Sequence, residues 1–99
     1  MLIRLIYAST AAGVVDVPEL QHILTTAQKH NPNDDLTGVL AFNSKIFLQA
    51  LEGNRDKVNK LFSKIMVDAR HTNVAVLSCK EIQVRHWSTW SMGFVAPNS

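Results

Sequence analysis

Short runs of apolar residues, separated by turn-forming residues, divide this chain into segments of two kinds. Five runs have the composition of β-strands, and they lie at residues 2–9, 36–42, 46–51, 74–84 and 90–95. In the third run, alternation places Phe47, Gln49 and Leu51 on one face and apolar residues on the other face as well. A strand that is apolar on both faces belongs inside a sheet, so we expect this strand to be central.

A first helix is predicted between the first two strands. Asp16 is placed to cap it, Pro18 falls in its first turn, and Glu19 completes a capping box. Pro32 disfavours helical geometry at the residue before it, so the helix is expected to end at Asn31. Its apolar stripe consists of Val17, Leu20, Ile23, Leu24 and Ala27.

A second helix is predicted between the third and fourth strands. Residues 52–54 are expected to turn into it, Asn54 to cap it, and residues 68–71 to close it with basic side chains that complement the helix dipole. Its apolar stripe consists of Val58, Leu61, Phe62, Ile65 and Ala69.

The order β-α-β-β-α-β with one additional C-terminal strand predicts an α+β fold of the ferredoxin-like type. Right-handed crossovers place both helices on one face of a mixed five-stranded sheet. The 99 residues fit one domain, which we assign to residues 1–99. In this topology the first and third strands are neighbours, so side chains from the two strands meet beneath the helices.

One polar pair stands out in this layout. Gln49 is the one amide in an apolar strand, and without partners its polar atoms would cost about 1–3 kcal/mol. Tyr7, the only tyrosine, closes the first apolar run on the face shared by Ile3 and Leu5. We therefore expect a hydrogen bond between Tyr7 and Gln49. A planar ligand between the two helices would explain two long polar groups in one apolar layer, although the spacing does not identify it.

The face of the sheet opposite the helices is also expected to be apolar. It consists of Leu2, Ile6, Ile46, Leu48 and Ala50. Two helices on one face leave this surface uncovered, and an apolar surface of this kind needs a cover. A second copy of the chain, which would make a homodimer, or another protein would supply it.

Composition excludes several classes of function. The net charge of +2 comes from interspersed charges, which does not favour nucleic-acid binding, and no segment has the length or pattern of a signal peptide or membrane span. Cys79 is the only cysteine, so a reducing cytoplasm is the expected location. His30 and His71 lack metal-ligand spacing, and no phosphate-binding loop or catalytic constellation is present. Asn31 alone is explained better as a helix end than as a ligand contact.

Five segments taken together resemble a known family. They are residues 5–9 (LIYAS), residues 31–32 with 36–40 (NP and LTGVL), residues 47–53 (FLQALEG), residues 68–71 (DARH) and residues 90–92 (WSM). In this order and spacing they resemble the BLUF domain, a blue-light sensor that uses flavin adenine dinucleotide (FAD). The resemblance extends from about Leu2 to about Val95.

The resemblance implies a non-covalent FAD between the two helices. Ile23 and Ile65 would lie on either side of its ring, Asn31 would pair with the polar edge, and Gln49 would reach the N5/O4 edge. The residues implied near the ring rim, ribityl chain and phosphates are Lys29, His30, Asp68, Arg70 and His71. Trp90 and Met92 match a pair in the last strand that is thought to exchange inward and outward positions.

The implied activity is light sensing without substrate turnover. Blue light excites the flavin, Tyr7 gives and takes back an electron and a proton, and Gln49 emerges rotated or tautomerised with a slightly red-shifted flavin. The last strand would carry this change to an effector protein or domain that the sequence does not reveal. Two rivals are an acylphosphatase-type enzyme and a ligand-free interaction module. A yellow protein separates the sensor from both.

Overall fold

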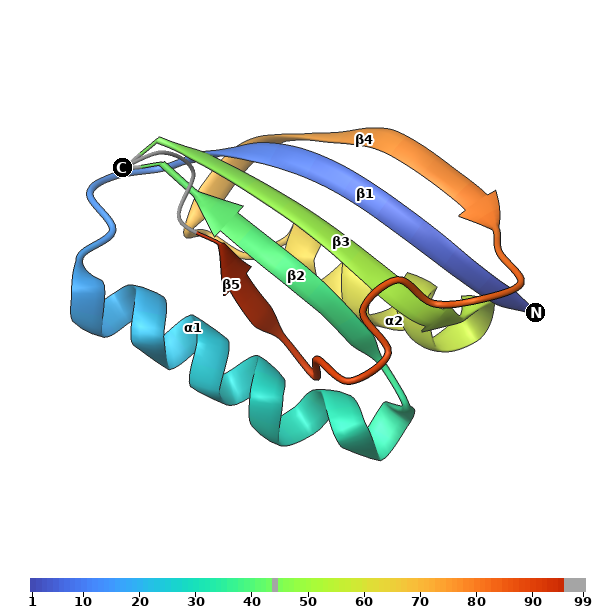
Figure 1. Cartoon of the computed structure of the whole chain (residues 1–99). Coiled ribbons are helices and arrows are strands. Elements are labelled where there is room, and N and C mark those ends of the chain that lie inside the picture. The colour runs from blue at the N-terminus through green and yellow to red at the C-terminus, as the bar shows by residue number, and fades with distance from the viewer. Residues whose placement is uncertain (44, 96–99) are drawn as a thin grey trace.

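A five-stranded sheet carries two helices on one of its faces (Figure 1). A computed structural model describes residues 1–43 and 45–95 of the chain. The strands are β1 (Leu2–Ala11), β2 (Thr37–Phe42), β3 (Ile46–Asn54), β4 (His71–Glu81) and β5 (Gly93–Val95). The helices are α1 (Val17–His30) and α2 (Arg55–Met66), and a 3-10 turn, η1 (Asn31–Asp34), follows α1.

The sheet has the order β4-β1-β3-β2-β5, so β3 is its central strand, as predicted. β3 pairs antiparallel with β1 and β2, β1 pairs antiparallel with β4, and the edge strand β5 runs parallel to β2. The ferredoxin-like α+β architecture with an additional strand and a mixed sheet is therefore confirmed. In the β1–β3 ladder Tyr7 lies directly opposite Gln49.

Both helices begin at the residues that the sequence predicts. The Asp16 carboxylate accepts a hydrogen bond from the backbone N–H of Glu19 at 2.9 Å, and the Asn54 amide oxygen accepts one from Asp56 at 3.1 Å. Such caps satisfy backbone donors that have no partner inside the helix. None of the described helices is long and apolar enough to cross a membrane.

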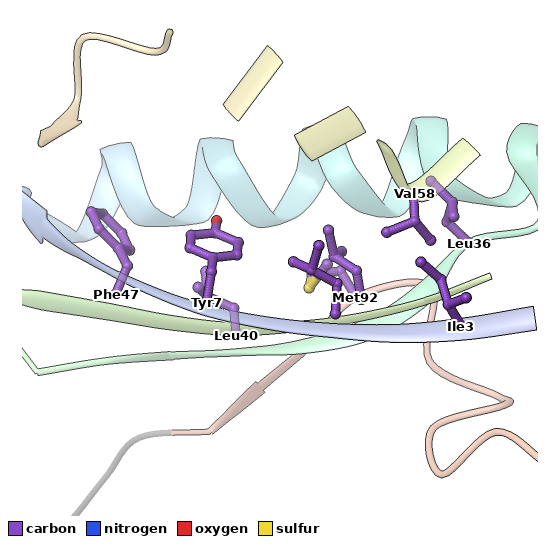
Figure 2. Packing of buried hydrophobic residues seen from close by; sticks show 9 residues of the cluster. Ile3, Tyr7, Leu36, Leu40, Phe47, Val58 and Met92 are labelled. Atoms are coloured by element: carbon purple, nitrogen blue, oxygen red, sulfur yellow. The ribbon is translucent and has the colours of Figure 1, made fainter. Parts of the chain in front are cut away.

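The core lies between the sheet and the helices, and Figure 2 shows Ile3, Tyr7 and Phe47 rising from the strands toward the helical layer, where Val58 of α2 meets the core. Its buried members are Ile3, Leu5, Tyr7, Leu36, Leu40, Phe47, Leu51, Val58 and Met92. Val58 is the buried residue of α2, whereas no residue of α1 is buried. The apolar stripes of the two helices are thus only partly covered by the protein, which leaves room between them.

Several predicted boundaries are wrong, and the last strand, predicted at residues 90–95, begins only at Gly93. Residues 52–54 continue β3 instead of turning into α2, because the β1–β3 ladder extends to the pair of Leu2 and Asn54. Helix α2 ends at Met66, and residues 68–71 form a turn in which Asp68 accepts from the backbone N–H of Arg70 at 2.9 Å. Strand β4, predicted at residues 74–84, therefore begins earlier, at His71, and it also ends earlier, at Glu81.

The open face of the sheet differs from the prediction at one end. Ile46 and Leu48 are about two-fifths exposed, as expected for an uncovered apolar face. Ala50, however, is only 5% exposed. The segment between β4 and β5 crosses this end of the face, where the backbone N–H groups of His86 and Trp87 bond to the Glu52 carboxylate.

Candidate functional site

A cavity of about 310 Å³ lies between the two helices, above the middle of the sheet. Its floor comes from the three inner strands and its walls from α1, α2 and the turn after α2. The predicted site residues that line it are Tyr7, Ile23, His30, Asn31, Gln49, Ile65, Asp68, Arg70, His71 and Met92. Segments far apart in the sequence therefore converge where a ligand was predicted.

The floor of the cavity holds the expected polar pair. The Tyr7 hydroxyl donates a hydrogen bond to Oε1 of Gln49, and both side chains are buried. Antiparallel pairing at the centre of the sheet fixes the distance between the two Cα atoms, so the contact follows from the register of β1 and β3. Tyr7 also packs against Phe62 of α2, with ring centroids 5.4 Å apart.

The other end of the Gln49 amide faces Met92. Nε2 of Gln49 lies 3.5 Å from the Met92 sulfur, which is a weak acceptor. Met92 is 3% exposed and rises from the sheet on the same side as Tyr7 (Figure 2). Trp90 is instead 43% exposed and does not line the cavity. The structure thus places Met92 inward and Trp90 outward.

Two amides at the end of α1 tie the last segment of the chain to the cavity. Nδ2 of Asn31 donates to the backbone oxygen of Ser91 at 2.7 Å, and Nε2 of Gln28 donates to that of Met92 at 3.0 Å. The backbone of Asn31 ends the helix, as predicted, and its buried side chain lines the cavity. Sequence reasoning missed Gln28, although its i, i+3 spacing from Asn31 places both on one helix face.

Charged groups border the cavity beyond Tyr7. Arg70 makes an exposed ion pair with Asp68, whose hydrogen bonds lower the pKa of the Asp68 carboxyl and raise that of the Arg70 guanidinium. Burial, together with the nearby Asp68 carboxylate, raises the pKa of the Tyr7 hydroxyl well above its usual range. Tyr7 therefore stays protonated at neutral pH and keeps a proton to give.

His71 joins this group through a residue that sequence reasoning missed. Its Nδ1 lies 2.8 Å from the Ser9 hydroxyl, and its ring meets Tyr7 edge-on with centroids 6.4 Å apart. Ser9 lies two residues beyond Tyr7 on the same strand and face, so the alternation along the strand could have identified it as a residue of the site. Lys29 is exposed and is not among the residues that line the cavity, whereas Lys64 of α2 is.

A second buried polar pair lies on the opposite face of the same two strands. Arg4 of β1 is directly opposite Glu52 of β3, and its Nε donates to the Glu52 carboxylate at 2.9 Å. The backbone N–H groups of His86 and Trp87 donate to the same carboxylate at 2.9 and 3.0 Å. Burial alone raises the pKa of Glu52, but these three hydrogen bonds outweigh it and leave the pKa below its usual range.

Comparisons with known proteins agree with this geometry. The family model described as "Sensors of blue-light using FAD", BLUF, matches residues 2–93. The blue light- and temperature-regulated antirepressor BluF of Escherichia coli K12 is 33% identical over 92 residues, which cover 93% of this chain and 23% of that protein.

Solved structures have the same fold. A bacterial light-regulated adenylyl cyclase superposes with a TM-score of 0.95 at 39% identity, over all of this chain and 30% of the cyclase chain. Klebsiella pneumoniae BlrP1, solved with FMN and cyclic diGMP, superposes with a TM-score of 0.90 at 31% identity, over 97% of this chain and 26% of that one. The chain thus spans less than a third of these relatives. The chain belongs to the BLUF family, the sensors of blue light that use a flavin.

Proposed function

We propose that the flavin of this domain is FAD, that its ring occupies the cavity between α1 and α2, and that the Tyr7–Gln49 pair is the light-driven switch. One observation carries the proposal. The Gln49 amide is buried with its oxygen bonded to Tyr7, while within the described residues its nitrogen reaches just a thioether sulfur. A ligand acceptor at the cavity floor would give that nitrogen a stronger partner, since buried donors favour strong acceptors.

The shape and lining of the cavity suit a planar ring. A volume of about 310 Å³ is at the small end of ligand sites, enough for a ring system whose chain extends outward. Ile23 of α1 and Ile65 of α2 would cover its two faces, and Asn31 would bond its polar edge. We assign the rim and the ribityl chain to His30, Asp68, Arg70 and His71, and Lys29 to the outer, phosphate-bearing part.

When bound, the flavin supplies blue-light absorption and an electron acceptor. Tyr7 supplies an electron and its hydroxyl proton, and takes both back. While Tyr7 lacks this proton, its oxygen has no hydrogen to donate to Oε1 of Gln49. The amide is then free to change its hydrogen-bond pattern. An amide serves either pattern because it carries a donor end and an acceptor end. No substrate is turned over in this cycle.

The preference for FAD over a shorter flavin rests on a second cleft of about 280 Å³ that adjoins the first. The two clefts share His30, Asn31, Leu61 and Lys64, and the second adds Lys57 and Lys60 of α2. Lys57 is paired with Asp34 at 3.4 Å, but Lys60 and Lys64 suit the diphosphate of FAD, whereas riboflavin has no phosphate to pair with them.

Binding measurements with FAD, FMN and riboflavin test this assignment. We expect FAD to bind most tightly, and we expect Lys60→Gln, at a lysine that lines only the second cleft, to weaken the binding of FAD while leaving that of riboflavin unchanged. Lys80→Gln, on exposed β4, is the matched control and should change neither. Equal affinity of the wild type for FAD and riboflavin would contradict the FAD assignment and leave the flavin switch intact.

We also propose that the open face of the sheet mediates a homodimer and that the protein acts in the cytoplasm. In this proposal the signal passes to a partner protein and not to nucleic acid or a membrane. Ile46 and Leu48 are exposed on the open face toward the hairpin end of β3, and half-buried Ile6 lies on the same face. Light scattering after size exclusion should show a dimer for the wild type and a flavin-binding monomer for Ile46→Lys with Leu48→Lys. A monomeric wild type at high concentration would exclude the dimer.

A further inference from the structure

The indole of Trp90 lies on the bare Cα of Gly93, the first residue of β5. A methyl group placed on Gly93 would overlap Cε3 of Trp90 and lie 2.9 Å from Cδ2 and Cζ3. Real side chains do not tolerate such distances, so no other residue type fits beneath the ring in this arrangement. We call this contact between Gly93 and the Trp90 indole the indole seat.

The glycine is needed for space and not for backbone geometry. No described glycine has a positive φ, so the backbone of Gly93 is one that alanine also adopts. The backbone of Trp90 is held as well, since its carbonyl accepts from Gly38 of β2 at 3.0 Å and its N–H donates to Trp87 at 3.1 Å. A methyl group at Gly93 would therefore displace the indole or separate β5 from β2.

The seat is coupled to the switch through the chain between Trp90 and Gly93. Met92 precedes Gly93 directly and carries the sulfur that contacts Nε2 of Gln49. Asn31, which lines the same cavity, holds the backbone of Ser91, and Gln28 holds that of Met92. When Gln49 changes its hydrogen bonds, the contact between its Nε2 and the Met92 sulfur is lost or regained. We expect Ser91 and Met92 to shift as a result, and this shift disturbs the indole seat between Trp90 and Gly93.

We infer that Gly93 is a positioning residue of the photocycle, whose missing side chain seats Trp90 outward and so holds Met92 against Gln49 in the resting state. The inference rests on the proposed Tyr7–Gln49 switch. Return from the lit state requires the indole to regain its seat, and overpacking of a close contact opposes that return.

The test compares Gly93→Ala with Gly13→Ala, a control at which a methyl group meets no atom within 4 Å. We expect Gly93→Ala to retain flavin and the light-induced red shift, to move the Trp90 indole N–H resonance in the dark, and to slow recovery by about five- to tenfold. Trp87→Phe assigns the two indole resonances. An unmoved resonance with wild-type recovery, or faster recovery, would overturn the inference.

A second background shows whether the effect passes through the indole. In Trp90→Leu the seat is empty, so adding Gly93→Ala should change recovery little. If Gly93→Ala slows the return to the dark state equally in the Trp90→Leu background, it acts on the pairing of β5 with β2, and the inference is wrong. If Gly93→Ala does not fold, the double variant with Trp90→Leu becomes the test. Restored folding in the double variant would support the seat, and continued failure to fold would contradict it. A wild type without any red shift would refute the switch, whereas the dark resonance would still report on the seat.

Discussion

The strands β1 and β3 carry two buried cross-strand pairs that face opposite sides of the sheet. Tyr7–Gln49 points into the cavity beneath the helices, and Arg4–Glu52 points to the other face, three residues along each strand. Both pairs are buried and hydrogen-bonded, yet they differ in how fully the polar atoms of the β3 residue are paired. Glu52 accepts three hydrogen bonds, two of them from the segment that leads to β5, whereas Nε2 of Gln49 meets a sulfur 3.5 Å away.

This difference separates a structural pair from a switch. A carboxylate held by three donors has one low-energy arrangement, and removing any partner leaves a buried charge uncompensated. An amide held at one end carries both a donor and an acceptor, so it can serve either of two hydrogen-bond patterns at a ligand. We therefore propose that two pairs three residues apart in one ladder serve as a fixed anchor and as a movable contact. Glu52 contacts the segment that leads to Trp90, and Gln49 contacts Met92.

The largest expected effect is on stability, through the anchor. Glu52→Gln leaves the buried Arg4 guanidinium without its counter-charge, and we expect the free energy of unfolding to fall by about 3–5 kcal/mol. Chemical denaturation measures this loss. Arg4→Met with Glu52→Leu removes both charges and should recover part of it. A loss as small as that of a surface substitution would show that the pair is not an anchor.

A smaller effect is expected on flavin retention, through the cavity. Asn31→Ala removes a side chain that hydrogen-bonds Ser91 and lines the site. The binding free energy of the flavin should therefore become less favourable by about 1–3 kcal/mol. Equilibrium dialysis gives the affinity and thermal unfolding of the flavin-free protein gives the stability. If stability drops while flavin affinity is unchanged, Asn31 is only a helix end.

Acid should weaken the anchor before it affects the switch. The folded-state pKa of Glu52 lies below its ordinary value of 4.5, so its stabilising contribution is present above pH 4.5 and is lost as pH falls through the lower, folded value. Thermal unfolding of the wild type should therefore drop more steeply in this range than that of Arg4→Met with Glu52→Leu. Parallel pH profiles for the two proteins would contradict the assignment. Asp68, whose pKa is also lowered, is present in both.

The smallest expected effect is that of mild alkali on the switch. Burial raises the folded-state pKa of Tyr7 above its ordinary value of 10.0, so the hydroxyl keeps its proton up to that pH. The amplitude of the light-induced red shift should therefore stay constant from neutral pH to pH 10. A titration of the amplitude with a midpoint below 10 would show that the Tyr7 hydroxyl is more exposed than the structure indicates.

The two pairs also show what the sequence reveals. An amide in an apolar strand is conspicuous, so Gln49 and its partner Tyr7 could be found from pattern and topology. Glu52 precedes glycine and asparagine, so the local pattern indicates a turn residue. Its donors His86 and Trp87 lie 34 and 35 residues away, which no local pattern reveals. The inward position of Met92 and the seat at Gly93 depend on contacts between the last segment and the sheet, which local patterns do not encode.

The central claim is that blue light acts on a flavin through Tyr7 and Gln49. The most direct measurement is the light-minus-dark absorption spectrum of the purified, flavin-loaded protein, recorded for the wild type and for Tyr7→Phe. We expect a small, reversible red shift in the wild type and none in Tyr7→Phe, which still binds flavin. No other tyrosine is present to substitute. A normal, reversible shift in Tyr7→Phe would contradict the account.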